Sequence, residues 1–280
     1  MISGGKISCR SPENSAKNTF FMIEQIRTIR RFWKASRSLG SVDLALFPYR
    51  SGPVWHRDYV NGFVLKLTEF PLPRTAKCLV DIGANVGLFS RAAELYCPTA
   101  RIFAVEPSER AFREMRARCG PRVEALRAAV GDRVGEATLH IANQLASSSL
   151  RPPSADLAER FEGKVKPSGQ TETVTLTTLD QLHKDYALGS IDLLKIDVEG
   201  FEPEVLSGGA ETLANHVDRV MIEVSFARLG SEKAMELINY FIRLGFILAH
   251  VTDVDRAREL AIGPINQLDV YFTHPRARFV

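Results

Sequence analysis

The sequence predicts an α/β protein with a doubly wound, mostly parallel sheet and helices on both faces. From Cys78 onward, short apolar runs alternate with stretches of helical periodicity, a glycine-containing loop follows the first run, and acidic residues end several later runs. Such alternation is typical of βαβ units. The expected strands are residues 78–82, 101–106, 123–130, 191–197, 219–224, 246–251 and 268–272.

Helices are expected between these strands, and one segment interrupts the alternation. The expected helices are residues 87–97, 108–118, 202–214 and 231–244. Residues 134–178 carry two additional strand-like runs, 137–142 and 173–178, separated by a polar loop at 146–170. A long insertion in a compact domain is usually functional or disordered.

Composition excludes several classes of protein. The net charge of +3 over 280 residues is too small to indicate a nucleic-acid partner, so none is expected. The four cysteines form no CxxC pair, which argues against zinc and suits reduced thiols in a cytosolic protein. No apolar stretch reaches the roughly 20 residues that span a bilayer, and the first residues do not resemble a signal peptide. We therefore expect a cytoplasmic protein.

Residues 1–75 are expected to form an N-terminal extension to a domain at 76–280. An amphipathic helix is predicted at about 19–39, with an apolar stripe that includes Met22, Ile26, Ile29 and Trp33 and is flanked by basic residues. A connector follows, in which residues 62–67 suggest a short strand. The helix can act as a lid within its own fold or make peripheral contact with a membrane, and both interpretations stay open.

The glycine-containing loop predicts a cofactor site. Asp81, Gly83, Asn85 and Gly87 follow the first expected strand, and Glu106 ends the next strand 19 residues after Gly87. In an open α/β sheet, ligands bind beyond the carboxyl ends of the strands, where such a glutamate can accept hydrogen bonds from adenosine ribose hydroxyls. Asp81 can hold the loop or attract an ammonium group. The alternative is a plain strand-to-helix turn with a helix-capping glutamate.

The loop favours S-adenosylmethionine over a nicotinamide dinucleotide. A pyrophosphate cradle needs a middle glycine, and this loop has Asn85 there. A nicotinamide-dependent oxidoreductase remains the alternative. At the end of the third expected strand, Val130 can pack on the adenine ring and Asp132 can bond its edge, unless these residues form only a turn.

Three charged residues at alternating positions predict a reaction face. Lys195, Asp197 and Glu199 follow an apolar strand, and alternate side chains of an extended chain share one face. Methyl transfer to a hydroxyl needs a proton acceptor, a role for either carboxylate, with Lys195 orienting it. The alternative is a salt bridge that fixes the strand end. No metal is expected, although Asp197 and Glu223 together offer the oxygen ligands that hard cations prefer.

The ordered motifs resemble the FkbM family of methyltransferases. They are DIGANVG at 81–87, AVEP at 104–107, AVGD at 129–132, TLD at 178–180, LLKIDVEGFEPEVLSGG at 193–209 and MIEV at 221–224. The resemblance implies the seven-stranded methyltransferase sheet, S-adenosylmethionine as donor and O-methylation of a sugar or natural-product hydroxyl.

The resemblance leaves several points open. It does not cover the first 75 residues. It places the serine run 147–149 near the substrate, although that run can also be a flexible loop. The acceptor is expected to be a small molecule or a glycan. A non-catalytic adapter that binds the cofactor without turnover is the remaining alternative.

Overall fold

The computed structural model describes residues 54–70, 72–142, 148–152, 167–256 and 265–277. The chain divides into two compact units, Met1–Glu69 and Phe70–Val280. The helix expected at 19–39 lies outside the described residues, as do Ser147 and most of the loop at 146–170. Among the described residues, no helix combines the length and apolar character needed to cross a membrane.

In the first unit, the described residues form one helix, α2 (Val54–Glu69). The short strand expected at 62–67 is therefore wrong. Val60, Val64 and Leu67 are all at most 1% exposed, and their spacing of four and three residues is that of one helix face. The short window 62–67 lacks Val60, so it shows only two of the three residues of this stripe.

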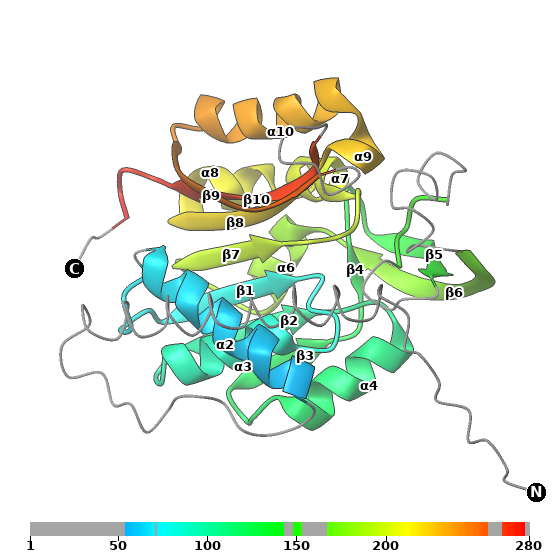
Figure 1. The fold of residues 1–280 in the computed structure, drawn as a ribbon, viewed down its shortest axis with the longest axis horizontal. Helices are drawn as coiled ribbons and strands as arrows, with labels where there is room; N and C mark the ends of the chain where they lie inside the picture. The colour runs from blue at the N-terminus through cyan, green and yellow to red at the C-terminus, as the bar shows by residue number, and fades with distance from the viewer. Residues whose placement is uncertain (1–53, 71, 143–147, 153–166, 257–264, 278–280) are drawn as a thin grey trace, which may run out of the picture. The chain divides into compact units, whose positions relative to one another are not determined.

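The second unit is built around a seven-stranded sheet of order β3-β2-β1-β7-β8-β10-β9 (Figure 1). The strands up to β8 run parallel, whereas β10 is antiparallel to both of its neighbours. The predicted Rossmann-like, mostly parallel sheet is confirmed. Its strands are β1 (Cys78–Ile82), β2 (Arg101–Val105), β3 (Val123–Leu126), β7 (Leu193–Ile196), β8 (Arg219–Ser225), β9 (Ile247–Arg256) and β10 (Ile265–Thr273).

Helices pack on both faces of this sheet, as a doubly wound fold requires. In β2, Phe103 and Val105 belong to a core shared with α6, α7, α8 and α10, whereas Ala104 between them packs with Met115 of α4. The helices of this unit are α3 (Leu88–Tyr96), α4 (Glu109–Arg118), α6 (Leu179–Asp185), α7 (Glu202–Ser207), α8 (Ala210–His216), α9 (Phe226–Leu229) and α10 (Ser231–Arg243). The side chains of β2 thus alternate between two cores, the period of a strand buried on both faces.

Two expected elements are each divided in the structure. The strand expected at 123–130 ends at Leu126, and after two residues the chain forms β4 (Ala129–Val130), which belongs to a second sheet. The helix expected at 202–214 is broken between α7 and α8 at Gly208 and Gly209. A Cβ on Gly208 would lie 2.0 Å from the Gly131 carbonyl oxygen, so the break lets the chain pass close to the end of β4.

The second sheet has three strands in the order β4-β6-β5, formed with β5 (Gly135–Ala142) and β6 (Pro167–Thr177). These are the two additional strands expected in the interrupting segment. Figure 1 shows the small sheet beyond the end of the large sheet to which β1, β2 and β7 point. Because ligands bind at that end of an α/β sheet, the small sheet stands beside the expected site.

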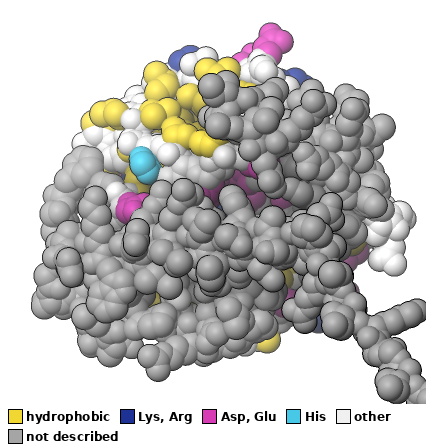
Figure 2. All heavy atoms as spheres, in the orientation of Figure 1, with side chains coloured by type: hydrophobic (Ala, Val, Ile, Leu, Met, Phe, Trp, Pro, Cys, Tyr) yellow, Lys and Arg dark blue, Asp and Glu magenta, His cyan; other side chains and the backbone are white. Residues whose placement is uncertain are grey.

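The edge strand β9 and the neighbouring helix α10 expose apolar side chains. Figure 2 shows hydrophobic side chains gathered on the upper part of the face it displays. The exposed large apolar residues of β9 and α10 are Met235, Ile242, Ile247, Leu248, Val251 and Val254. Apolar exposure along a sheet edge is unusual for a monomer, because such an edge can pair with another chain.

The close approach of the β1 and β7 ends yields a test of the fold. Gly83 and Gly169 both have φ of 78°, but a Cβ on Gly83 would lie 1.8 Å from the Asp197 carbonyl oxygen, whereas a Cβ on Gly169 meets nothing within 4 Å. We expect Gly169→Ala to lower the free energy of unfolding by about 1–2 kcal/mol, the backbone cost alone. Gly83→Ala should cost about 3 kcal/mol or more in chemical denaturation. Equal effects would contradict the close approach.

Candidate active site

The site lies where the strand order reverses. From β1 the chain goes to β2 and β3 on one side of the sheet, whereas β7 and β8 lie on the other side of β1. The loops after β1 and β7 therefore diverge and leave a crevice at their carboxyl ends. The glycine-containing loop follows β1, and the Lys195-Asp197-Glu199 segment spans the end of β7, so the fold brings the two predicted motifs together.

The loop after β1 is held by the neighbouring strand β2. The backbone N–H groups of Gly83 and Ala84 both donate to the Val105 carbonyl oxygen at 3.0 Å. Asn85 adopts a left-handed conformation with φ of 50°. Gly87 does so as well, and there a Cβ would overlap the Met115 side chain. The glycines therefore serve the sharp turn and the close packing that their pattern predicted.

Glu106 is a buried carboxylate at the end of β2. Its Oε2 accepts a hydrogen bond from the Asn85 N–H, and its Oε1 accepts one from the Ser108 N–H, both at 2.8 Å. Burial raises the pKa of Glu106 to about 7, although these two hydrogen bonds oppose the rise. A carboxylate has about four acceptor positions, so each oxygen keeps capacity for a further donor. Glu106 thus pins the loop, a role that the sequence did not reveal, and can still accept ribose hydroxyls.

The loop also presents an acceptor with no described partner. Within the described part of the chain, the buried Oδ1 of Asn85 accepts no hydrogen bond. Buried polar groups are rarely left in that state, so such an atom points to a missing donor. The hydroxyl, amino and ammonium groups of S-adenosylmethionine are donors of this kind. Asp81, Gly83, Asn85, Gly87 and Glu106 therefore fit the predicted cofactor.

Val130 and Asp132 do not end the third strand of the large sheet, as the adenine prediction assumed. Val130 lies in β4, which pairs with β6, and its side chain is buried in the core. Asp132 lies in the connection between β4 and β5, where it is ion-paired with Arg133 at 3.0 Å. The chain leaves the large sheet after Leu126, so residues 127–128, not 130–132, continue from the end of β3. Val130 and Asp132 therefore do not lie at the end of β3, which is the position that the predicted contacts with adenine require.

A buried lysine links the ends of β1 and β7. Asp81 and Lys195 are paired in the sheet, and their charged groups lie 3.6 Å apart. The Lys195 ammonium also donates to Asp197 Oδ2 at 2.9 Å. The hydroxyl of Ser90, on α3, donates to Asp81 Oδ2 at 2.6 Å. Burial lowers the pKa of Lys195, but Asp197 and Asp81 more than compensate and raise it above its usual value, so Lys195 stays charged and cannot act as a base.

Glu199 reaches the site through a turn, not along an extended strand. The strand β7 ends at Ile196, and Glu199 has a left-handed backbone with φ of 56°. Its carboxylate lies 2.5 Å from the Arg228 guanidinium and is 17% exposed. Burial, with the charges of Asp197 and Glu202, outweighs Arg228 and raises the pKa of Glu199 to about 8. Alternation therefore explains Lys195 and Asp197 but not Glu199.

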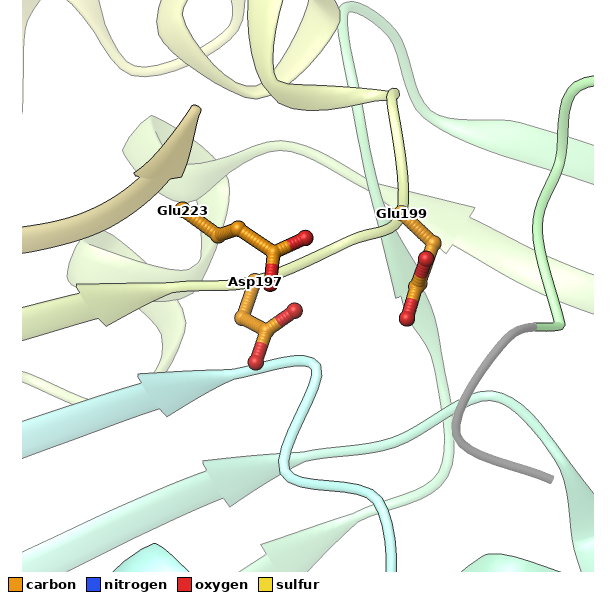
Figure 3. Close-up of side chains that lie close together, drawn as sticks. All are labelled: Asp197, Glu199 and Glu223. Atoms are coloured by element: carbon orange, nitrogen blue, oxygen red, sulfur yellow. The ribbon is translucent and has the colours of Figure 1, made fainter. Parts of the chain in front are cut away.

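Three carboxylates converge in the crevice. Asp197, Glu199 and Glu223 each place a carboxylate oxygen within 4.8 Å of the other two, and Figure 3 shows Glu223 and Asp197 reaching toward each other from neighbouring strands. Glu223 Oε2 accepts a hydrogen bond from Gln267 at 3.0 Å. Burial raises the pKa of Glu223 well above its usual value, and the neighbouring acids add to this.

The arrangement offers both a proton acceptor and the ligands of a hard cation. Oxygen atoms at these separations can coordinate Mg²⁺ or Ca²⁺. Two of the three carboxylates are already paired, Asp197 with Lys195 and Glu199 with Arg228. A cation would compete with these two fixed charges. The ion pairs therefore favour the proton-accepting role.

Four further residues complete the site. The family resemblance had placed Ser149 near the substrate, whereas the motifs gave Glu202, Arg228 and Asp269 no role. Glu202 caps the turn, because its Oε1 accepts hydrogen bonds from the N–H groups of Val198 and Gly200. Asp269 pairs with Glu223 across β10 and β8. Ser149 and Arg228 contact Glu199. Arg228 and Asp269 stand alone in their segments, so only the fold brings them here.

A family model described as Methyltransferase FkbM domain matches residues 81–248, more than half of the chain. The chain belongs to the FkbM methyltransferase family. The match includes the glycine-containing loop, Glu106, the Lys195-Asp197-Glu199 segment and Glu223. The nicotinamide-dependent oxidoreductase is therefore not supported.

Two curated proteins illustrate what this FkbM chain is similar to. It is 33% identical to 2-O-methyltransferase NoeI of Sinorhizobium fredii over 167 residues, which cover 55% of this chain and 64% of NoeI. It is 31% identical to methyltransferase sdnD of Sordaria araneosa over 173 residues, which cover 52% of this chain and 65% of sdnD. The match thus spans just under two thirds of each relative.

Among solved structures, the Methanococcus jannaschii fibrillarin pre-rRNA processing protein aligns with 73% of this chain and 68% of its own. The identity is 12% and the TM-score is 0.43. At this level of likeness, the assignment of the fold rests on the strand order itself.

The raised pKa of Glu223 predicts how a neutral replacement changes stability. A carboxyl whose pKa is raised by folding stabilises the protein below its unfolded pKa, and that contribution is lost as the pH rises through the folded pKa. Glu223→Gln removes the buried charge, so its melting temperature should exceed that of the wild type by an amount that grows from pH 5 to pH 8. We expect about 2–4 °C at pH 8 by calorimetry. The exposed Glu136→Gln is the control, and a difference independent of pH would contradict the buried charge.

Proposed function

We propose that the protein is an S-adenosylmethionine-dependent O-methyltransferase. The observation that carries the proposal is the position of Lys195, Asp197 and Glu199 beside the glycine-containing loop, at the switch point of a sheet in a chain of the FkbM family. S-adenosylmethionine, when bound, supplies a methyl group that is already activated by the positive sulfur. The protein then has to orient the hydroxyl, exclude water and take up a proton.

We assign cofactor binding to the loop after β1 and to the end of β2. Glu106 offers its carboxylate to the ribose hydroxyls. Asn85 Oδ1, which accepts no hydrogen bond from any described residue, offers an acceptor to a donor group. Gly83 keeps the loop backbone close to the end of β7. Asp81 is fully buried and committed to Ser90 and Lys195, so we place it in support of the loop and not in direct contact with the ligand.

We assign proton uptake to Glu199, with Asp197 as its neighbour in the same cluster. A general base works best when its pKa lies near the working pH, and the pKa of Glu199 of about 8 meets this condition. The methyl carbon would leave the sulfur, giving S-adenosylhomocysteine, as it bonds to the acceptor oxygen, and the hydroxyl proton would pass to the Glu199 carboxylate. Lys195 remains a fixed cation that holds Asp197 in place.

The acceptor that we propose is a hydroxyl of a sugar, glycoconjugate or other natural product. Support comes from NoeI, whose name describes a 2-O-methyltransferase. We propose a small-molecule or glycan partner and no nucleic acid, and peripheral membrane contact through residues 19–39 stays a prediction. The direct test is transfer of labelled methyl from S-adenosylmethionine to a panel of glycosides, with the product located by NMR. Cofactor binding without transfer to any member would favour the adapter.

The cofactor assignment predicts selective binding. By calorimetry, S-adenosylhomocysteine should bind and NAD should not. Glu106→Ala should weaken S-adenosylhomocysteine binding by about 1–3 kcal/mol, since a charged acceptor is lost. Ribose hydroxyls favour the ionised carboxylate, so the affinity should fall as the pH drops below about 7, the pKa of Glu106, and Glu106→Gln should remove this dependence. Tight NAD binding or an unchanged affinity in Glu106→Ala would refute the assignment.

The reaction face predicts two variants that bind the cofactor but react slowly. Glu199→Gln or Asp197→Asn, or both, should lower kcat by about 10²-fold, because shape is kept and the proton acceptor is lost. In the wild type, kcat should rise with pH up to about 8, as Glu199 loses its proton. The exposed Glu211→Gln is the control. The assignment fails if both variants keep full activity.

Repeating the same assay with a chelator distinguishes proton acceptance by a carboxylate from cation binding by the carboxylate cluster. If a carboxylate alone accepts the proton, EDTA should leave activity unchanged. Loss of activity with EDTA and recovery with Mg²⁺ would instead assign Asp197, Glu199 and Glu223 to a cation.

A further inference from the structure

We propose that Ser149, Arg151 and Arg228 are positioning residues that fix the Glu199–Gly200 turn, so that the Glu199 carboxylate faces Asp197 and Glu223. The inference deepens the proposed function, since it rests on Glu199 as the proton acceptor. Two of the three residues come from the segment between β5 and β6 and one from α9. They therefore reach the turn from separate parts of the chain.

The turn does not hold its conformation through its own backbone preference. Glu199 and Gly200 both have positive φ, 56° and 96°. A side chain in the left-handed region costs about 1–2 kcal/mol, so other contacts must maintain this conformation. Glu202 supplies one of them by accepting hydrogen bonds from the Val198 and Gly200 N–H groups at 3.2 and 3.1 Å.

Ser149 and Arg151 hold the carbonyl groups of the turn. The buried Ser149 hydroxyl donates to the Glu199 carbonyl oxygen at 2.8 Å and accepts a hydrogen bond from the Arg151 N–H at 3.1 Å. Arg151 Nε donates to the Gly200 carbonyl oxygen. Its Nη2 lies 2.8 and 3.0 Å from the two carboxylate oxygens of Glu204, on α7. Both carbonyls of the turn are thus bound by one short segment next to the small sheet.

Arg228 holds the side chain of the turn. Its guanidinium lies 2.5 Å from the Glu199 carboxylate, and its own side chain is 6% exposed. A Cβ on Gly200 would lie 3.1 Å from both Cβ and Cδ of Arg228, so the arginine packs directly on the turn. The carboxylates of Asp197 and Glu202 raise the pKa of Glu199, whereas Arg228 lowers it. Arg228 is thus the cation that offsets them.

Together these contacts fix the backbone and the carboxylate of Glu199 independently. Figure 3 shows the result, with Glu199 on the turn that follows Asp197 and across the crevice from Glu223. Losing a contact to a carbonyl should release the turn, whereas losing Arg228 should mainly leave the carboxylate without its cation. The two kinds of variant should therefore give different signatures.

Amide hydrogen exchange of the full-length protein tests the backbone contacts. The Val198 and Gly200 amides donate to Glu202. The end of β7 just before them is reported by the Asp197 amide, which donates to the Ile82 carbonyl oxygen at 3.0 Å. Ser149→Ala and Arg151→Lys should each speed exchange at Val198 and Gly200 by about tenfold or more, with Asp197 unchanged. The exposed Arg133→Ala is the control. Unchanged exchange, or uniform acceleration at all three amides, would overturn the assignment.

Titration of Glu199 tests the side-chain contact. In protein labelled with ¹³C at the glutamate carboxyl group, the Glu199 signal is identified by its loss in Glu199→Gln. Arg228→Met should raise the titration midpoint of Glu199 by at least one pH unit, Arg228→Lys should restore most of the shift, and Ser149→Ala should change it little. An unchanged midpoint in Arg228→Met would overturn the role of Arg228, even if that variant is less stable.

Neither measurement uses an acceptor or a cofactor. If the variants change neither amide exchange nor the Glu199 titration midpoint while labelled methyl is still transferred, only the positioning inference is refuted. If both measurements change as expected but S-adenosylhomocysteine does not bind, the turn is held as proposed and the proposed function is refuted.

Discussion

The site depends on one buried charge, the ammonium of Lys195 between Asp81 and Asp197. Asp81 has no exposed surface, and an unpaired charge there would cost several kcal/mol. The ammonium compensates it and at the same time fixes Asp197 at the edge of the crevice. Since Ser90 bonds the other oxygen of Asp81, the same interaction joins β1, β7 and α3. The cofactor loop and the reaction face are therefore held in register by a single ion-pair network.

Around this network the site collects more negative charge than it neutralises. Burial raises the pKa of Glu199, Glu202 and Glu223, and the charge of Asp197 adds to the rise in all three. Only Glu199 has an arginine partner among the described ion pairs. Such a cluster lowers stability as its members ionise. Perturbed carboxylates of this kind collect at functional sites, because catalysis needs groups whose pKa lies near the working pH. The clustering of the carboxylates thus both lowers the stability of the fold and gives them the pKa values that proton transfer needs.

The sequence revealed what is local and missed what is brought together by the fold. The strands were predictable because buried parallel strands are short apolar runs, and Lys195 with Asp197 because alternate residues share a face. The break after Leu126 was not predictable, since pairing with β6 outweighed the strand-like pattern that runs from Val123 to Val130. Arg228 could not be predicted either, because its partner lies 29 residues earlier, in a turn.

The left-handed backbone of Glu199 has an evolutionary consequence. At φ of 56°, glycine or asparagine would fit the turn with less strain than glutamate does. Losing the glutamate would relieve that strain, but it would also leave the buried Arg228 guanidinium without its carboxylate partner, which costs more. The turn and the ion pair therefore constrain positions 199 and 228 together, so a change at one of them is tolerated best when the other changes with it.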